Sequence, residues 1–264
     1  VRHTVEDNTL TLVQRSAAVE LTSVFTGYDD TNAVRAVQTY TNISGEKLCL
    51  TAANTLSVRF GTDAAKEQRE WYFHKFTNAR YNEAMPDVRS LFDMGLYGRY
   101  AVLHTENVGN ASSYENLPQG IVENRRTGQF LMFQIESYYD WFYEITIGGN
   151  GLFNLQLGGP TALRHAWNKV LVPGESYTAV PAAVAAGNSL NDVLANMTRY
   201  RRHLLPVCEA DEHLPAIFNE YMHYSWDNPF ASVTAETAPV VAKSGCEYYI
   251  IDCGWQANVI PKGA

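Results

Sequence analysis

The sequence contains few cysteines, and it has no long apolar run. Its four cysteines in 264 residues fit no CxxC metal spacing and are too few for a disulfide framework. The simplest prediction is therefore a reduced, cytoplasmic protein. No apolar run approaches the ~18 to 20 residues of a membrane span, and no charged-then-apolar signal peptide follows Val1. We therefore expect no membrane partner.

Charged residues are also sparse, at 18% of the chain, and acidic residues outnumber basic ones. The net charge of −8 argues against non-specific binding to nucleic acid or to an anionic membrane, whereas neutral substrates remain open. The seven histidines show no HExxH spacing, and we expect neither a metal nor another cofactor. The length and the 46% hydrophobic content are typical of a globular protein with one large or two smaller domains.

The first 187 residues have the texture of β-structure. Short runs rich in Val, Thr, Tyr and Phe, such as Ala33–Thr41 and Trp71–Thr77, are broken by Gly, Asn, Asp and Pro at turn positions. Several strands at this spacing predict an antiparallel β-sandwich. The clearest predicted hairpin joins Phe130–Glu136 to Trp141–Ile147, and a third strand at Leu152–Leu157 predicts a meander.

The apolar period changes after Asn188. From Ser189 to Leu205 the apolar positions follow helical spacing, with Asn188 or Ser189 as the N-cap and Pro206 after the end. This pattern predicts one helix that links the β-sandwich to the rest of the chain.

The remaining residues predict a βαβ unit. The short apolar run Ala216–Phe218 precedes a helix-length Ala/Val-rich stretch, Ser232–Lys243, which offers Ser and Thr as possible N-caps and has Gly245 after its end. The unalternated run Tyr248–Ile251 then predicts a strand buried on both faces and parallel to the first.

Polar and aromatic residues follow both predicted strands. Asn219, Glu220 and Tyr221 come after the first strand, and Asp252 and Trp255 come after the second. The carboxyl ends of parallel strands meet at one edge, where ligands bind. A carboxylate beside an indole suits a sugar, because the acid accepts hydrogen bonds from hydroxyls and the indole packs on the ring.

Two blocks of this sequence resemble the family 36 glycoside hydrolases, the α-galactosidases. GCEYYIIDCGW, within residues 215–255, is similar to the start of their catalytic barrel, where a strand ends in Asp-x-Gly-Trp. ENRRTGQFLMFQIESYYDWFYEI, upstream, resembles their N-terminal β-domain. The resemblance implies a mostly β fold with a supersandwich-like domain over residues 1–187, a linker helix over 188–206, and the truncated start of a (β/α)8 barrel over 207–264.

The resemblance also implies substrate-binding residues. Asp252 matches the first acid of the family motif, which implies binding of galactose hydroxyls, with Trp255 beside it. Tyr221 falls where many members have a Trp that closes the sugar pocket, and Trp226 could serve that surface instead. Many members have a second Asp at the position of Cys253, and a thiol is too weak a hydrogen-bonding group to replace it.

The resemblance implies a retaining α-galactosidase that acts on α-galactoside oligosaccharides, but no catalytic residue lies in this chain. Both bond-breaking aspartates of the family lie on later barrel strands, and the stretch after Leu205 is far shorter than the ~200 residues of a complete barrel. We therefore expect the 264-residue chain alone to be inactive. Alternatives are a galactosyltransferase similar to raffinose synthase and a non-catalytic carbohydrate-binding β-sandwich module. A homo-oligomeric full-length form is left open.

Overall fold

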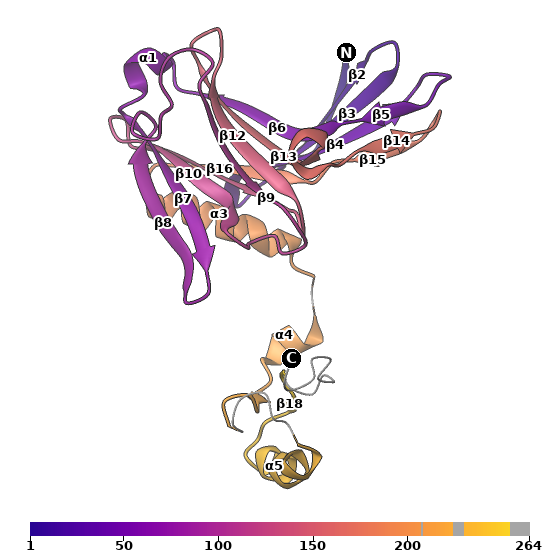
Figure 1. Cartoon of the computed structure of the whole chain (residues 1–264), viewed down its shortest axis with the longest axis vertical. Coiled ribbons are helices and arrows are strands. Elements are labelled where there is room, and N and C mark those ends of the chain that lie inside the picture. The colour runs from indigo at the N-terminus through magenta and orange to yellow at the C-terminus, as the bar shows by residue number, and fades with distance from the viewer. Residues whose placement is uncertain (207, 224–229, 254–264) are drawn as a thin grey trace, which may run out of the picture. The chain divides into compact units, whose positions relative to one another are not determined.

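The computed structural model describes residues 1–206, 208–223 and 230–253, and the chain divides into two compact units, 1–204 and 205–264. We call these the β-unit and the C-terminal unit. Figure 1 shows the β-unit as two sheets with one long helix. The predicted mostly β fold with antiparallel sheets is confirmed. Within the described residues, no helix is both long and apolar enough to cross a membrane.

The larger sheet has ten strands, and all of its neighbouring strands pair antiparallel. In spatial order they are β1 (Arg2–Glu6), β2 (Thr9–Arg15), β3 (Val19–Tyr28), β4 (Thr31–Asn42), β16 (Ala182–Gly187), β11 (Gln129–Ile135), β10 (Asn116–Asn124), β7 (Trp71–Ala79) and β8 (Asn82–Ser90), with β15 (Ser176–Thr178) also paired to β4.

The smaller sheet has four strands, in the order β6 (Ala52–Phe60), β13 (Phe153–Thr161), β12 (Trp141–Ile147) and β9 (Val102–Asn107). A separate pair joins β5 (Leu48–Leu50) to β14 (Lys169–Leu171). The helices of the β-unit are α1 (Ala64–Glu67), α2 (Ala162–His165) and α3 (Leu190–Leu204).

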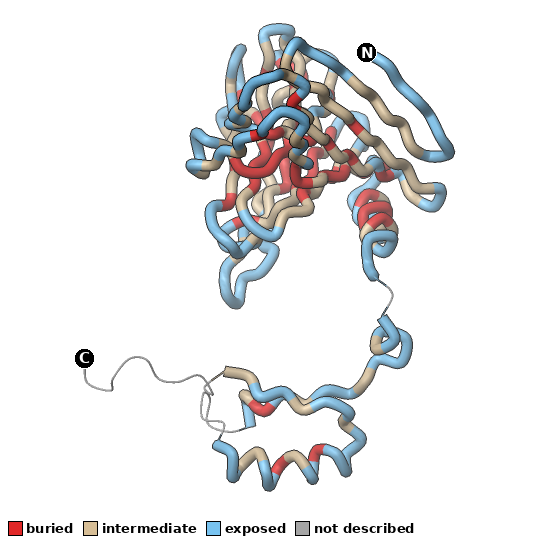
Figure 2. The backbone as a smooth tube through the Cα atoms, turned by 90° about the vertical axis from the view of Figure 1, so that its right-hand side faces the viewer, coloured by how far each residue is buried: buried red, intermediate tan, exposed pale blue. Residues whose placement is uncertain are grey.

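The main core lies between the two sheets. Alternate residues of β12 and β13 point inward and pack on aromatic residues of the larger sheet. Tyr143 stands edge-on to Phe73 and Phe133, with ring centroids 5.8 and 5.0 Å away. Figure 2 shows the buried residues concentrated here and along one side of α3.

The predicted helix is α3, and it packs on the larger sheet. Its buried residues Val193, Met197 and Tyr200 form a second core cluster with Ile121, Met132 and three alanines of β4 and β16. Gly187 allows this approach, because a Cβ there would lie 2.6 Å from the backbone nitrogen of Val193. The three-part domain division remains a prediction; in the structure, contacts group α3 with the β-unit.

Ser189, one of the two predicted N-cap residues, caps α3. The Ser189 hydroxyl accepts a hydrogen bond from the Asp192 backbone N–H at 3.1 Å, and the Asp192 carboxylate accepts one from the Asn188 N–H at 2.9 Å. These two hydrogen bonds satisfy two backbone donors at the helix start.

The predicted hairpin between β11 and β12 is wrong. β11 pairs with β10 and β16 in the larger sheet, whereas β12 pairs with β13 and β9 in the smaller one. The five residues 136–140 therefore carry the chain from one sheet to the other. The physical reason is burial. Trp141 and Tyr143 can bury their side chains against the larger sheet only if β12 lies across the core from that sheet. The second half of the predicted meander, β12 with β13, is confirmed.

A buried carboxylate fixes one end of the sandwich. Glu67 is 6% exposed, and its oxygens accept hydrogen bonds from the Trp71 indole N–H at 2.9 Å, the Thr62 backbone N–H at 3.2 Å and the Thr62 hydroxyl. Gly61 has a φ of +70°, and a Cβ there would lie 2.8 Å from the carboxylate. Burial opposes ionisation of Glu67, but these hydrogen bonds outweigh it and hold its pKa below the usual value.

We expect Glu67→Gln to destabilise the protein at pH 7 by about 1 to 3 kcal/mol. The groups around this side chain are hydrogen-bond donors from Thr62 and Trp71, and the NH2 group of a glutamine would face one of them without an acceptor. A carboxyl group whose pKa is lowered by folding stabilises the fold above its unfolded pKa and loses that contribution as the pH falls through its folded pKa. The gap between variant and wild type should therefore close below pH 4.5, the ordinary value for the group. Urea unfolding at several pH values measures this. Glu46→Gln, at an exposed position, is the control, and a gap that does not change with pH would contradict the account.

The C-terminal unit contains α4 (Glu209–His213), β17 (Ile217–Asn219), α5 (Ala231–Lys243) and β18 (Tyr248–Ile250). β17 and β18 pair in parallel, with Phe218 opposite Tyr249, so the predicted strand–helix–strand order and pairing are confirmed. One detail is corrected, since the N-cap of α5 is Phe230 with no side-chain hydrogen bond, rather than a Ser or Thr. Two strands do not make a barrel, so the start of a barrel remains a prediction.

Candidate functional site

The candidate site lies where β17 and β18 end together. Parallel register places Asn219, the last residue of β17, opposite Ile250, the last residue of β18. Asp252 follows two residues later at the same edge. The chain thus brings an amide and a carboxylate together from positions 33 residues apart in the sequence. We call Asn219, Tyr221 and Asp252 the strand-end site.

Asp252 is held as an ionised acceptor. Its Oδ2 accepts a hydrogen bond from the Asn219 side-chain amide at 2.7 Å, and its Oδ1 accepts one from the Cys253 backbone N–H at 2.8 Å. The hydrogen bond from Asn219, and with it those from Cys253, lowers the pKa of Asp252 below its ordinary value. A carboxylate has about four lone-pair positions, and the Asn219 amide with the backbone and thiol of Cys253 uses up to three of them, which leaves capacity for a further donor.

Asn219 is itself locked in orientation. Its Oδ1 accepts a hydrogen bond from the backbone N–H of Tyr221 at 2.9 Å, so its NH2 group must be the part that faces Asp252. The following turn, residues 221–223, therefore begins with Tyr221 fixed beside the site. The sequence predicts Asn219 at this edge but predicts no role for it, and its only signal is its position at the end of the first strand.

Glu220 lies beneath the edge rather than in the site. It is 2% exposed, and its Oε2 accepts hydrogen bonds from the Tyr249 hydroxyl at 2.6 Å and the Thr234 hydroxyl at 3.4 Å. Burial, and then the hydrogen bond to Glu220, raise the pKa of Tyr249 to about 12. Because Tyr249 lies on β18 and Thr234 on α5, this carboxylate ties together all three elements of the βαβ unit.

The predicted two-sided burial of the second strand is wrong for the described chain. Phe218 and Tyr249 share one face, with ring centroids 5.3 Å apart, and Tyr249 is tied to α5 through Glu220. The other face is open, with Ile217 56% and Tyr248 53% exposed. One helix can cover only one face of a strand pair, and the apolar residues of the other face lack a covering element among the described residues.

The structure brings together two of the four predicted site residues. Asp252 and Tyr221 lie at the same edge, joined through Asn219. Trp226 and Trp255 lie outside the described residues. Within residues 1–206, 208–223 and 230–253, no group of three or more His, Cys, Asp or Glu side chains could hold a metal ion.

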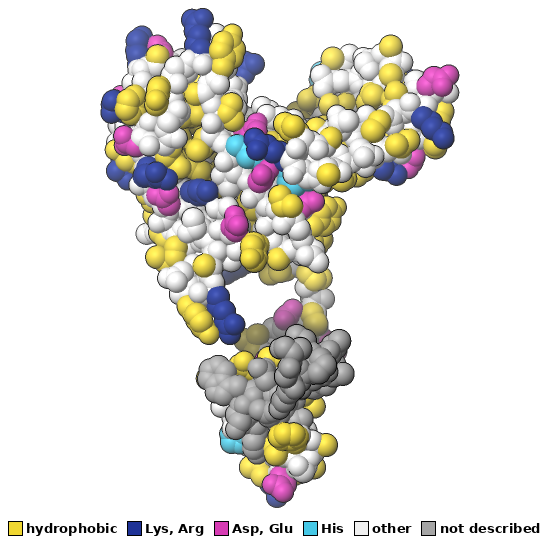
Figure 3. Space-filling model, in the orientation of Figure 1, with side chains coloured by type: hydrophobic (Ala, Val, Ile, Leu, Met, Phe, Trp, Pro, Cys, Tyr) yellow, Lys and Arg dark blue, Asp and Glu magenta, His cyan; other side chains and the backbone are white. Residues whose placement is uncertain are grey.

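Charges of the two signs are mixed on one face of the β-unit. On the face that Figure 3 shows, basic and acidic side chains lie interspersed over the β-unit. The expectation that neither nucleic acid nor a membrane is a partner remains a prediction.

Comparison with known proteins gives a likeness of fold. No family model matches the sequence, and no curated protein matches it. Solved structures of family 36 α-galactosidases do match. AgaB of Geobacillus stearothermophilus has a TM-score of 0.77 at 20% identity, with 94% of this chain and 33% of that chain covered.

Two further structures agree. A variant of AgaA from Geobacillus stearothermophilus in complex with stachyose has a TM-score of 0.79 at 19% identity, with 97% of this chain and 35% of that chain covered. The α-galactosidase from Lactobacillus brevis has a TM-score of 0.74 at 15% identity, with 94% and 33% covered. This chain spans about a third of the length of each of these structures. The predicted resemblance is thereby confirmed as a shared fold.

Proposed function

We propose that this chain is the β-domain and first barrel strands of a retaining α-galactosidase, which removes terminal α-D-galactosyl residues from oligosaccharides. The observation that carries the proposal is the ionised carboxylate of Asp252, held by Asn219 at the carboxyl edge of a parallel strand pair. The likeness of fold supports it.

In this proposal Asp252 binds the terminal galactose. Its remaining acceptor capacity receives a hydrogen bond from a sugar hydroxyl, and bonds to a charged acceptor are roughly twice as strong as neutral ones. The lowered pKa keeps the group ionised through the neutral and mildly acidic range. In the same proposal Trp255 packs on the apolar face of the sugar, and the pocket is closed by Tyr221 or, in its place, by Trp226.

Cys253 sets this site apart from many members of the family. A thiol is a weak donor and a weak acceptor, so the second carboxylate that those members use has no equivalent at this position. Recognition of sugar hydroxyls therefore depends more heavily on Asp252 here than it does in the members that have a second carboxylate. The cytoplasmic location and an oligosaccharide substrate belong to the same proposal.

We expect the purified 264-residue chain to show no turnover of a chromogenic α-galactoside, because the bond-breaking carboxylates lie on strands that it does not contain. Release of nitrophenol from p-nitrophenyl α-galactoside measures this. Turnover by the 264-residue chain that a substitution within it abolishes would show that the chemistry is misplaced.

The decisive observation is the genomic sequence downstream of the Ala264 codon. A reading frame that continues and supplies two further aspartates at strand ends supports the enzyme, and its expressed product should hydrolyse the same substrate. A stop codon at that point would overturn the proposal in favour of a binding module.

A further inference from the structure

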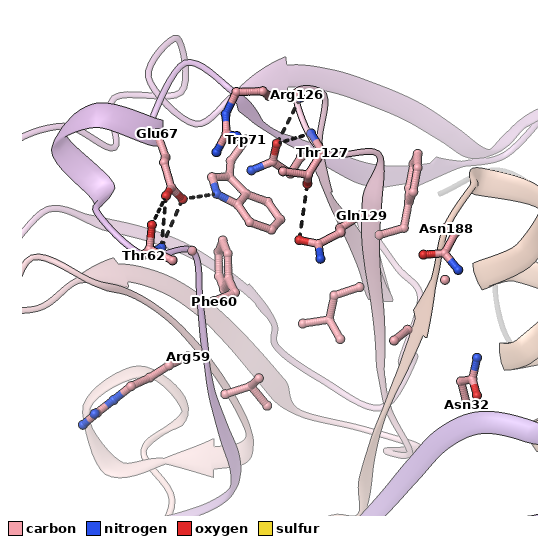
Figure 4. Close-up of a pocket in the computed structure, with 17 residues that line it drawn as sticks. Asn32, Arg59, Phe60, Thr62, Glu67, Trp71, Arg126, Thr127, Gln129 and Asn188 are labelled. Atoms are coloured by element: carbon pink, nitrogen blue, oxygen red, sulfur yellow. Dashed lines mark hydrogen bonds between the residues drawn. The ribbon is translucent and has the colours of Figure 1, made fainter.

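The β-unit contains a cavity of about 580 Å³ that the strand-end site does not use. Figure 4 shows it between the end of β6, the α1–β7 segment, the β10–β11 turn and the end of β16. All of its lining residues belong to residues 32–188, whereas Asp252 belongs to the C-terminal unit. Its volume lies in the range of ~300 to 1,000 Å³ for small-ligand sites.

One wall of the cavity is apolar and fixed. Phe60 and Trp71 stand edge-on with centroids 4.9 Å apart, and Leu131 lines the same space. The Glu67 carboxylate holds the Trp71 indole through the 2.9 Å hydrogen bond described above. Because this wall is already packed, a ligand would not have to order it.

Of the three charged side chains in the lining, Glu67, Arg126 and Arg59, the first two are already paired. The Glu67 oxygens already accept hydrogen bonds from Thr62 and Trp71, and the Arg126 Nε is paired with Glu70 at 2.7 Å. Arg59 points away from the cavity in Figure 4. An ionic ligand would lose its hydration without gaining a partner, so the lining favours a neutral one.

Carboxamides stand at the mouth. The side chains of Asn32 and Asn188 are exposed and make no hydrogen bond within the described residues, while Gln129 accepts one from the Thr127 hydroxyl at 3.3 Å and keeps its NH2 group available. An amide both donates and accepts, as does a hydroxyl group. Polar amides opposite an aromatic wall match a molecule with hydroxyls at its edge and C–H bonds on its face.

We propose that this cavity binds a neutral mono- or disaccharide. The site lies within the β-unit. It would bind a sugar without cleaving it, because its one carboxylate, that of Glu67, already accepts hydrogen bonds from Thr62 and Trp71. The proposal does not depend on hydrolysis by the strand-end site.

The test is titration of the 264-residue chain with galactose, melibiose and raffinose, with binding measured by calorimetry and by the NMR shifts of backbone amides. We expect binding that shifts the amides of Thr127, Gln129 and Asn188. The double variant Gln129→Ala with Asn188→Ala should raise Kd about tenfold, as expected for the loss of two neutral hydrogen bonds. Ala186→Trp, which places an indole in the cavity, should abolish binding.

Asn110→Ala is the matched control, because Asn110 is an exposed asparagine in a loop that does not line the cavity. It should bind as the wild type does. If Ala186→Trp does not fold, the double alanine variant at two exposed positions decides the question. No binding of any of the three sugars at concentrations well above a millimolar Kd would overturn the proposal.

A separate outcome distinguishes this site from the strand-end site. Binding that Asp252→Asn removes but Ala186→Trp retains would assign the sugar to the strand edge and overturn the cavity proposal. The reverse pattern supports the cavity and leaves the proposed galactosidase function to its own test.

Discussion

Replacing Trp141 by alanine is expected to lower the free energy of unfolding by about 3 to 5 kcal/mol, the cost typical of removing a buried aromatic side chain. Trp141 is fully buried, it stacks on Tyr143 with ring centroids 5.7 Å apart, and its indole N–H donates to the Ser112 carbonyl at 2.7 Å. The substitution leaves a cavity between the sheets and an unsatisfied carbonyl. For a unit of this size the melting temperature should fall by about 6 to 20 °C.

Thermal unfolding followed by near-ultraviolet circular dichroism measures the loss in the β-unit. Trp141→Phe should lose less, because a phenyl ring keeps six of the nine ring atoms of the indole, although it leaves a smaller cavity and gives up the hydrogen bond to Ser112. Tyr138→Ala is the control, since Tyr138 is 87% exposed in the preceding turn, and its loss should stay within about 0.5 kcal/mol. Equal losses for Trp141→Ala and Tyr138→Ala would show that β12 does not close the core.

The same strand shows where sequence reasoning ends. Alternation located β12 and β11 to within a residue or two, because period-2 burial is a local property. Alternation does not tell which strand is the hydrogen-bonded neighbour. A five-residue connection looks alike in a hairpin and in a crossing between two sheets, and only the burial of Trp141 against the other sheet distinguishes them.

Helix α3 and the βαβ unit were predictable for a different reason. Their signals are contiguous: Ser189 and Asp192 cap α3 within one turn, and Gly245 adopts a φ of +92° just after α5. What α3 packs on was not predictable, since its partners Ile121 and Met132 lie far back in the chain.

The strand-end site and the cavity also differ in how far the sequence alone predicts them. Asp252 could be found from a short motif, whereas the roles of Asn219 and Glu220 depend on contacts across 33 and 29 residues. The cavity could not be found at all, because its walls come from segments between Asn32 and Asn188 that only the folded sheets bring together.

Under the proposed α-galactosidase function, Asp252→Asn in the full-length protein is expected to lower kcat/KM for an α-galactoside about 10- to 100-fold. The Asn219 NH2 group and the Cys253 N–H both point donors at this side chain, and Asn219 cannot turn because the Tyr221 N–H holds its oxygen. An amide at position 252 must therefore face one donor with its own NH2, and it offers sugar hydroxyls a neutral acceptor in place of a charged one. The loss of a charge-assisted bond, roughly 1.5 to 3 kcal/mol, corresponds to one to two decades in rate.

Steady-state kinetics and thermal unfolding of the same purified variant decide between binding and structure. A residue at a strand end outside the core should change the melting temperature little while kcat/KM falls. Asp211→Asn, an exposed acid on α4 of the same unit, is the control and should change neither quantity. A lowered melting temperature with nearly normal kinetics would show that Asp252 only caps the strand edge, because a carboxylate that binds no sugar can act only through Asn219 and Cys253.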